Sequence, residues 1–435
     1  MIVVFMLPKT NKLINILIGL AYAFIYHFVY TNYMYVYFSY MYCPDPTPIN
    51  SSLSLYLFLA SSPLLFYKGF NTLASGLSFM VYLLMYIPMI YVTFITDISS
   101  STQSGILISL YVFSITCFIT DNKYLFKKKW LSQRRQKIPF RLLEVTTIIL
   151  LMFVLIVEGK SLRFVNILSQ SDLMYEMRAS YSSSRLVITG YLISWLKTAF
   201  LPVLLVAYLH SKSRIKYILV LFAYLIMFML DMQKITFVMP FVVTLVYFLA
   251  KKNSFNKFMH GSIIVFFSTL SLVLVSTINN RLSYSIAAIF IMRMQCLDSW
   301  IFSLYLKFFE DHPYTYYSHI NFVNALTHSY PYKDALGVVV TEGGMNANAS
   351  FLVTDGYAAL GISGFFIIGS IFIVLKSVFN CIDLRYNRNY VLLTLFPAIS
   401  SMLNVSLFTA IFSCGFLLLY IIYKYVNLSP LENPK

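Results

Sequence analysis

Long apolar runs recur along most of the chain and constrain its fold more than any other feature. They are about 17–22 residues long, close to the length that a helix needs to cross the hydrocarbon core of a bilayer. Only helices and closed barrels satisfy all their backbone hydrogen bonds in that environment. Charged residues make up 11% of the 435 positions, against about a quarter in soluble domains. The pattern predicts an all-α, polytopic membrane bundle that forms a single domain over residues 1–435.

We expect about twelve transmembrane helices, because about twelve apolar runs approach the length of a span. Two longer polar stretches, 158–188 and 278–354, separate some of these runs. The expected spans cover residues 13–30, 53–67, 73–95, 105–120, 141–157, 189–209, 216–231, 235–250, 261–277, 355–377, 391–403 and 406–423.

The distribution of lysine and arginine predicts the orientation of the bundle, since cytoplasmic loops carry an excess of these residues. They gather in the cluster from Lys127 to Arg141 and in alternate connections, and we count Lys376 among them. Both termini are therefore expected in the cytoplasm, with the two long polar stretches on the outer side. This topology accounts for the formal net charge of +16, so nucleic acid is not an expected partner.

Four basic residues of the outward segments are candidates for binding a phosphate group. Arg178, Arg185 and Arg293 offer the planar, permanently charged fork that suits phosphate. Lys234 lies in a short turn between two spans and could neutralise a further charge. The structural alternatives are arginines that meet lipid headgroups and a snorkelling lysine paired with Asp231.

Three residues of the second polar stretch and its edge are candidate general bases. His319 is of the residue type whose unperturbed pKa lies nearest neutral pH, and Glu342 and Asp355 are carboxylates that could accept a proton from a hydroxyl group. Asn346 and Asn348 lie in a segment of small residues and could bind sugar hydroxyls through their amides. The alternatives are a histidine with a structural hydrogen bond, a turn, and an acid near a helix N-terminus.

The same stretch contains one segment with helical amphipathicity, residues 298–310, which His312 and Pro313 should end. Its expected buried positions are Trp300, Phe302, Leu304, Leu306 and Phe309.

No set of residues has the spacing of a metal site. His312, His319 and His328 are seven and nine positions apart, unlike a helical zinc pair, and no cysteine completes a set. We therefore expect no metal and no cofactor.

Several segments resemble the bacterial O-antigen polymerases, a family of oligosaccharide repeat-unit polymerases. The resemblance extends over about residues 140–425 and is most specific over 307–364. The segments that carry it are 307–319, 330–332 and 346–364, with additional similarity at 233–236, 404–407 and 413–415.

The resemblance implies a metal-independent glycosyltransferase of the bacterial inner membrane that works on the periplasmic face. Its donor and acceptor would be undecaprenyl-diphosphate-linked oligosaccharides, with membrane lipid around it and a polysaccharide chain-length regulator as a further suggested partner. Combined with the residue analysis, Arg178, Arg185 and Arg293 would hold the diphosphate. One of the three candidate bases would activate the acceptor hydroxyl.

Two other functions stay open. An O-antigen ligase would use similar chemistry to transfer the chain to lipid A-core. A lipid-linked oligosaccharide flippase or another transporter would place charged residues inside its spans, and Lys197 in the sixth expected span is the residue that favours it.

Overall fold

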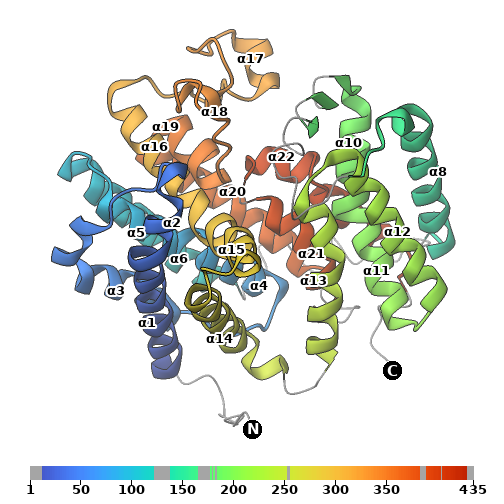
Figure 1. Cartoon of the computed structure of the whole chain (residues 1–435), viewed down its shortest axis with the longest axis horizontal. Helices are drawn as coiled ribbons and strands as arrows, with labels where there is room; N and C mark the ends of the chain where they lie inside the picture. Colours follow the sequence, from blue (N-terminus) through green and yellow to red (C-terminus); the bar gives the residue numbers. More distant parts are fainter. Residues whose placement is uncertain are drawn as a thin grey trace. The chain divides into compact units, whose positions relative to one another are not determined.

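The computed structural model describes residues 12–121, 138–164, 177–178, 180–181, 184–251, 255–382, 388–402 and 404–428. Every regular element in these ranges is a helix, and an isolated bridge pairs Ile138 with Val426. The all-α prediction is therefore confirmed for the described chain. The chain divides into two compact units, each with its own internal packing (Figure 1). The first comprises Met1–Lys123, Asn256–Ser377 and Leu403–Leu407, and the second comprises Tyr124–Phe255, Val378–Met402 and Phe408–Lys435.

The first unit contains a long N-terminal helix, a buried helix that follows it, and the segments of the second polar stretch. Its principal α-helices are α1 (Lys12–Val29), α2 (Tyr35–Phe38), α3 (Leu53–Ser61), α4 (Leu73–Val81), α5 (Ile87–Ile95), α6 (Ser100–Thr120), α14 (Phe255–Ser276), α15 (Arg281–Ala287), α16 (Leu297–Asp311), α17 (Asn321–Thr327), α18 (Leu336–Val339), α19 (Ala358–Leu360) and α20 (Ile362–Asn380). Short 3-10 or π-helical turns join several of them, namely η1 (Tyr30–Met34), η2 (Ser39–Met41), η3 (Thr47–Ser51), η4 (Ser62–Leu65), η5 (Tyr82–Tyr86), η8 (Ala288–Cys296) and η9 (Leu352–Tyr357).

The second unit is also helical. Its elements are α8 (Phe140–Glu158), η6 (Gly159–Ser161), α10 (Val187–Trp195), η7 (Leu196–Phe200), α11 (Leu201–His210), α12 (Arg214–Asp231), α13 (Lys234–Lys251), α21 (Arg388–Ser401), α22 (Leu407–Phe412) and α23 (Phe416–Tyr425).

Eight helices of the described chain are long and apolar enough to cross a membrane. Seven of them overlap expected spans, so the chain has the helices of a membrane protein. Four expected spans are shorter apolar helices, and the expected number of about twelve is not reached by length and composition. The eight are Lys12–Met41, Leu73–Ile95, Ser100–Thr120, Phe140–Ser161, Val187–His210, Arg281–Asp311, Ile362–Asn380 and Leu407–Tyr425.

The eighth helix, Arg281–Asp311, lies in the polar stretch 278–354, where the sequence predicted a loop with short helices. Its path can be followed by its contacts with two helices that run parallel to each other. Gly19 of α1 lies against the Tyr82 hydroxyl, and farther along α1 the Tyr30 ring lies 4.7 Å from the Tyr91 ring. Lys12–Met41 and Leu73–Ile95 therefore run in the same direction, and their C-terminal ends lie at the same end of the unit.

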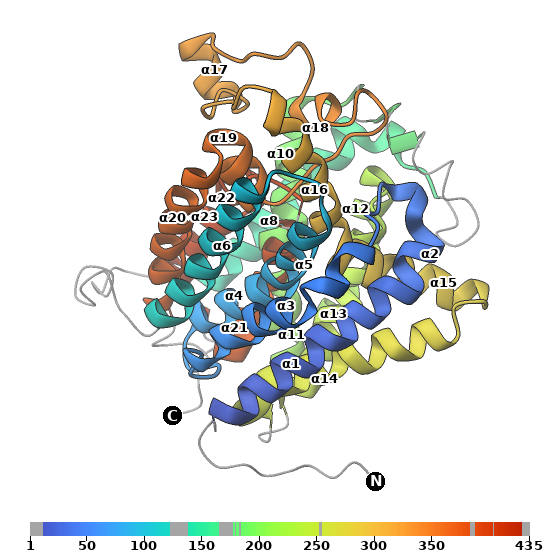
Figure 2. The ribbon, with the colours of Figure 1, turned by 90° about the vertical axis from the view of Figure 1, so that its left-hand side faces the viewer.

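Contacts along this reference show that Arg281–Asp311 bends back on itself (Figure 2). The Tyr284 ring stacks on Phe38 at 5.0 Å, near the C-terminal end of Lys12–Met41. Gln295 then accepts a hydrogen bond from the Tyr22 hydroxyl at 3.2 Å, deep along α1. Glu310 finally accepts one from the backbone N–H of Ser99, just after α5, at 2.7 Å.

The bend coincides with the end of the π-helical stretch η8, where Cys296 has φ −112° and ψ −40°. A π-helical stretch disrupts the regular hydrogen-bond ladder and is a common cause of helix bending. Both ends of Arg281–Asp311 therefore approach the same end of the α1 and α5 pair.

The amphipathic segment expected over 298–310 is confirmed as the core of α16. Trp300, Phe302, Leu306 and Phe309 are buried, while Leu304 is half-buried. The helix ends at Asp311, and the residue before Pro313 has an extended backbone, as the proline requires. Beyond α16, the helix α17 stands at the edge of the first unit in both views (Figures 1 and 2).

Candidate functional site

Two of the three predicted bases, His319 and Asp355, meet in the first unit. Asp355 lies in the π-helical turn η9 and is completely buried, whereas the His319 side chain is 9% exposed. One Asp355 oxygen lies 3.3 Å from His319 Nε2. The other accepts the backbone N–H of Leu407, the last residue of the first unit, at 2.6 Å. Both oxygens of the carboxylate are therefore engaged.

The second ring nitrogen of His319 is engaged as well. Its Nδ1 atom lies 2.8 Å from Thr315 Oγ1, which also lies 3.1 Å from the carbonyl oxygen of Ala358. That carbonyl already accepts the backbone N–H of Thr315 at 2.9 Å. The Thr315 hydroxyl is thus available to donate to His319 Nδ1 when the ring is neutral and Nε2–H donates to Asp355.

The same arrangement accommodates a protonated ring. An imidazolium donates from both nitrogens, so Nδ1–H would donate to Thr315 Oγ1, and the Thr315 hydroxyl would turn to Ala358 O. His319 can consequently gain a proton without leaving any of these three groups unsatisfied. The arrangement is compatible with proton transfer by a histidine.

Backbone hydrogen bonds tie the loop that carries His319 to the helix that follows Asp355. Thr315 and Tyr316 donate their N–H groups to Ala358 and Ala359, each at 2.9 Å. The Tyr314 ring packs against Gly361, whose φ is +61°, and a Cβ at this position would lie 2.7 Å from Tyr314 Cζ. Segments 307–319 and 346–364, which carry the family resemblance, therefore fold against each other.

The charge of Asp355 also affects a neighbouring tyrosine. Burial, and then the Asp355 carboxylate, raise the pKa of the Tyr317 phenol above its usual value. The phenol therefore keeps its proton at neutral pH, and Tyr317 is not an alternative base.

The segment of small residues before Asp355 is fixed to α16. Asp298 accepts the backbone N–H of Ser350 at 2.7 Å, and the Tyr305 hydroxyl donates to Ala347 O at 3.2 Å. The side chains of Asn346 and Asn348 remain exposed beside these anchors. They are placed where a polar ligand can reach them.

Glu342, the third predicted base, is exposed in a turn with φ +52°. Among the described residues, no hydrogen bond or ion pair joins its side chain to His319 or Asp355. The structure therefore brings two of the three candidates together and leaves Glu342 outside the pair.

The predicted phosphate-binding residues fall in both units. In the second unit, Arg178 is exposed, Arg185 lies 6.0 Å over the Tyr181 ring, and Lys234 begins α13. Burial, with a smaller contribution from Glu158, raises the pKa of Tyr181 to about 12. In the first unit, Arg293 lies exposed on η8. Most of the basic cluster from Lys127 to Arg141 lies outside the described residues.

An ion pair in the second unit joins Lys197, which is half-buried, to the buried Asp231. The lysine Nζ atom donates to Asp231 and to Gln233, both at 2.7 Å, from the π-helical stretch η7. Asp231 also accepts the Thr236 hydroxyl at 2.9 Å. Lys197 is therefore an ion-pair partner of Asp231 that the sequence did not indicate.

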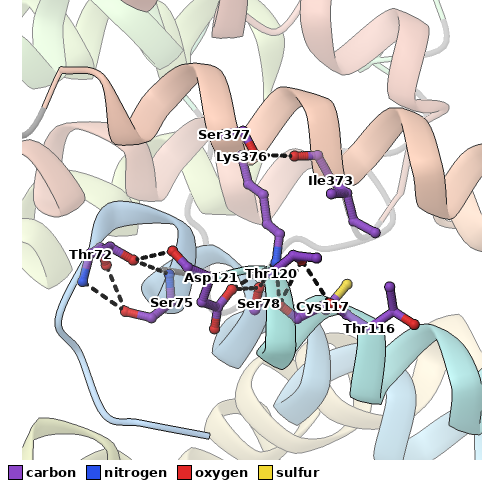
Figure 3. Close-up of polar contacts among 10 residues, drawn as sticks. All are labelled: Thr72, Ser75, Ser78, Thr116, Cys117, Thr120, Asp121, Ile373, Lys376 and Ser377. Atoms are coloured by element: carbon purple, nitrogen blue, oxygen red, sulfur yellow. Dashed lines mark hydrogen bonds and ion pairs between the residues drawn. The ribbon is translucent and has the colours of Figure 1, made fainter. Parts of the chain in front are cut away.

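A second ion pair, which is fully buried, involves Lys376, a lysine that we counted among the cytoplasmic basic residues. It is completely buried, and its Nζ atom donates to Asp121 at 2.7 Å, to Ser78 at 3.0 Å and to Cys117 O (Figure 3). Ser78 in turn donates to Asp121 at 2.6 Å. The three ammonium hydrogens each have a partner, so this lysine joins α4, α6 and α20.

Sequence reasoning missed Thr315, Asp298 and Tyr305. Asp298 was available as a signal, because a carboxylate inside an apolar helix usually has a specific partner. Thr315 gave no such signal, since a threonine four residues before a histidine is common in any loop.

The described residues contain no group of three or more His, Cys, Asp or Glu side chains that could hold a metal ion. No protein-family model, no curated protein and no solved structure matches the chain. The family resemblance therefore stays a prediction, and the candidate site depends on its own geometry.

Proposed function

We propose that this protein is an O-antigen polymerase, a metal-independent glycosyltransferase that joins undecaprenyl-diphosphate-linked oligosaccharide repeat units into a surface polysaccharide. The observation that carries the proposal is the His319–Asp355 pair. It forms where the two segments with the most specific resemblance fold against each other. A proton-accepting histidine with a buried carboxylate behind it is the group that such a transfer needs.

In this mechanism His319 is the general base and Asp355 is a positioning residue. Asp355 is completely buried with both oxygens engaged, which makes it poorly suited to contact a sugar. The Thr315 hydroxyl turns to Ala358 O and leaves His319 Nδ1 available to an acceptor hydroxyl. This hydroxyl attacks the anomeric carbon of the donor and loses its proton to Nδ1. The bond from that carbon to the diphosphate breaks, and its electron pair leaves with the lipid diphosphate.

Of the predicted phosphate-binding residues, Arg293 lies in the same unit as His319 and neutralises the diphosphate, which carries more charge as it leaves. Arg178, Arg185 and Lys234 belong to the second unit, and their role in binding the diphosphate stays a prediction from the sequence. Asn346 and Asn348, exposed beside the α16 anchors, bind sugar hydroxyls. The reaction takes place on the periplasmic face of the bacterial inner membrane, with both termini in the cytoplasm. A polysaccharide chain-length regulator is a partner under the same proposal.

A flippase or another transporter is the second candidate, and the Lys197–Asp231 pair favours it. Buried charges within membrane helices often mark a pathway for ions or substrates. Here Lys197 is 17% exposed in its side chain and lies in a π-helical stretch, a feature that is common at functional sites. An O-antigen ligase is the third candidate, because its chemistry would use the same base.

The test is complementation of a bacterial strain that lacks this protein. Wild type, His319→Gln and His328→Asn are compared, with expression of each measured by immunoblot. His328 is a matched control because it is exposed, and asparagine tolerates its φ of +47°. We expect a lipopolysaccharide ladder with wild type and the control. His319→Gln should leave core plus one repeat unit, since loss of a general base costs about 10²- to 10⁴-fold in rate.

Other outcomes select the alternatives. Bare core in the strain without the protein, with polymer accumulating on its lipid carrier, would identify a ligase. Repeat units that accumulate on the cytoplasmic leaflet would identify a flippase, and the assignment of His319 as a base would then be wrong.

A further inference from the structure

The second unit contains a cavity of about 380 Å³ that the proposed reaction does not use. It lies where α8 and α12 begin and α11 ends. Arg141, Glu144, Tyr208, Ser213 and Lys216 are among the residues that line it. A cavity with this lining is large enough for a phosphate group and the atoms attached to it.

The side chains in the cavity leave an excess of positive charge. Glu144 accepts hydrogen bonds from Lys216 Nζ at 2.8 Å and from the Tyr208 hydroxyl at 2.6 Å, so its charge is balanced within the cavity. Lys216 also lies 5.3 Å over the Tyr208 ring, which fixes its direction. Arg141 is exposed and remains as an additional cation whose planar fork suits phosphate oxygens.

The backbone adds to this positive field. Helix α8 begins at Phe140 and α12 begins at Arg214, and their N-cap residues, Pro139 and Ser213, both line the cavity. Neither N-cap makes a side-chain capping bond, and neither helix has an acidic residue in its first turn. The N-terminal ends of two helices of 18 or more residues thus contribute partial positive charge, which favours a bound anion.

Exposed apolar side chains lie beside the cavity on α8 and α12. Leu142 is 52% exposed on α8, and Ile215 and Ile218 on α12 are 77% and 61% exposed. Phe140–Ser161 and Val187–His210, which contribute to the lining, are both candidate spans. A basic cavity at the ends of such helices, next to exposed apolar side chains, fits a headgroup with its acyl chains alongside.

We propose that this cavity is a binding site for a phosphate ester, and that the headgroup of an anionic phospholipid is its source. Arg141 and Lys216 contact the phosphate oxygens, while Glu144 and Tyr208 hold Lys216 in place. The exposed apolar residues of α8 and α12 face the acyl chains. The site is independent of His319 and of the proposed reaction.

The test uses the purified full-length protein in a neutral detergent and measures its thermal unfolding temperature, Tm. Phosphatidylglycerol, phosphatidylcholine and inorganic phosphate are titrated separately. The variants are Arg141→Gln, Lys216→Gln and the matched control Arg214→Gln. Arg214 is also an exposed arginine at the start of a helix, but it does not line the cavity. A ligand that binds only the folded state raises Tm in proportion to its affinity.

We expect phosphatidylglycerol to raise the Tm of wild type and Arg214→Gln equally, and phosphatidylcholine to raise it much less. Arg141→Gln should need about tenfold more phosphatidylglycerol for the same shift, because it loses a charge-assisted hydrogen bond. Lys216→Gln should behave similarly. If Arg141→Gln does not fold, Lys216→Gln alone tests the proposal. An equal shift with inorganic phosphate would identify a free phosphate ester as the source. If neither phosphatidylglycerol nor phosphate shifts Tm, or if all three variants respond as wild type, the proposal is wrong.

Discussion

Thr315 decides which nitrogen of His319 can accept a proton. Its hydroxyl can donate either to His319 Nδ1 or to Ala358 O, and the Ala358 carbonyl does not depend on it, since it also accepts the backbone N–H of Thr315. A single hydroxyl therefore supports the neutral ring before proton transfer and the charged ring afterwards. This role requires the hydroxyl group of Thr315 but not its methyl group.

The first prediction compares Thr315→Val with Thr315→Ser. Valine keeps the shape of threonine but removes the partner of His319 Nδ1, so we expect about a tenfold loss of polymerisation and about 1 kcal/mol of stability. Serine keeps the hydroxyl and should retain most of the activity. The lipopolysaccharide ladder and the Tm in detergent measure both effects. A complete ladder from the valine variant would contradict the proton-transfer role of this hydroxyl.

At this scale the sequence indicated the individual residues but not their relationship. His319 and Asp355 were predicted as alternative bases, because nothing in the sequence shows that two residues this far apart meet. The hydrogen bond from Leu407 N–H, which comes from a third segment, could not be predicted either. The ability of histidine and aspartate to accept a proton follows from the residue type alone. The contact between His319 and Asp355 depends on the packed fold.

At the scale of helices, Gly364 packs directly against the backbone of Gly356 within the resemblance segment. A Cβ on Gly364 of α20 would lie 2.0 Å from the carbonyl oxygen of Gly356 in η9. A backbone oxygen cannot move aside as a flexible side chain can. The start of α20 therefore packs directly on the turn that carries Asp355.

The second prediction is that Gly364→Ala destabilises the protein by about 3 kcal/mol or more, because the methyl group meets backbone. Gly159→Ala is the matched control: a Cβ there meets nothing within 4 Å, and φ is −60°. The control should be neutral or gain up to about 1 kcal/mol, since alanine restricts the unfolded chain. Thermal unfolding in detergent measures both variants. Equal Tm values for the two would show that the close approach does not exist.

The third prediction concerns the Lys376–Asp121 pair that joins α4, α6 and α20. Lys376→Met and Asp121→Asn should each cost about 3–5 kcal/mol, because each leaves a buried charge without its partner. The double variant should cost clearly less than the sum of the two, since it leaves neither charge. Thermal unfolding of the four proteins gives this coupling energy. Additive losses would mean that the two side chains are stabilised by other partners.

Helix positions were predicted well because apolar runs of about this length allow little else in a membrane. The sequence predicted only short helices in 281–311, where six charged residues interrupt the apolar ones, and not one long helix. The burial of Lys376 was not predicted either. Both points have the same origin: contacts with other helices, rather than local sequence, decide whether a polar group in an apolar chain is buried.

At the scale of the whole molecule, the bend in Arg281–Asp311 determines how many times the chain crosses the membrane. A straight helix of this length would place its two ends on opposite faces. The contacts of Tyr284 with Phe38, and of Glu310 with Ser99, instead place both ends near the same end of two parallel helices. We therefore expect the helix to enter the membrane and return, with the residues before and after it on one side.

The fourth prediction tests this topology with single cysteines introduced at Asn279, Thr327 and Asn71 into a variant whose native cysteines are replaced. Asn279 and Thr327 flank the bent helix, while Asn71 follows α3 beside Lys68, on the expected cytoplasmic side. We expect a membrane-impermeant maleimide to label Asn279→Cys and Thr327→Cys in spheroplasts. Asn71→Cys should react only after the membrane is opened. Labelling of Thr327→Cys without Asn279→Cys would show that Arg281–Asp311 crosses the membrane. In that case either the N-terminal half has the opposite orientation to the predicted one, or it has one span fewer than predicted. The labelling of Thr327→Cys would then be the only evidence that His319 is periplasmic.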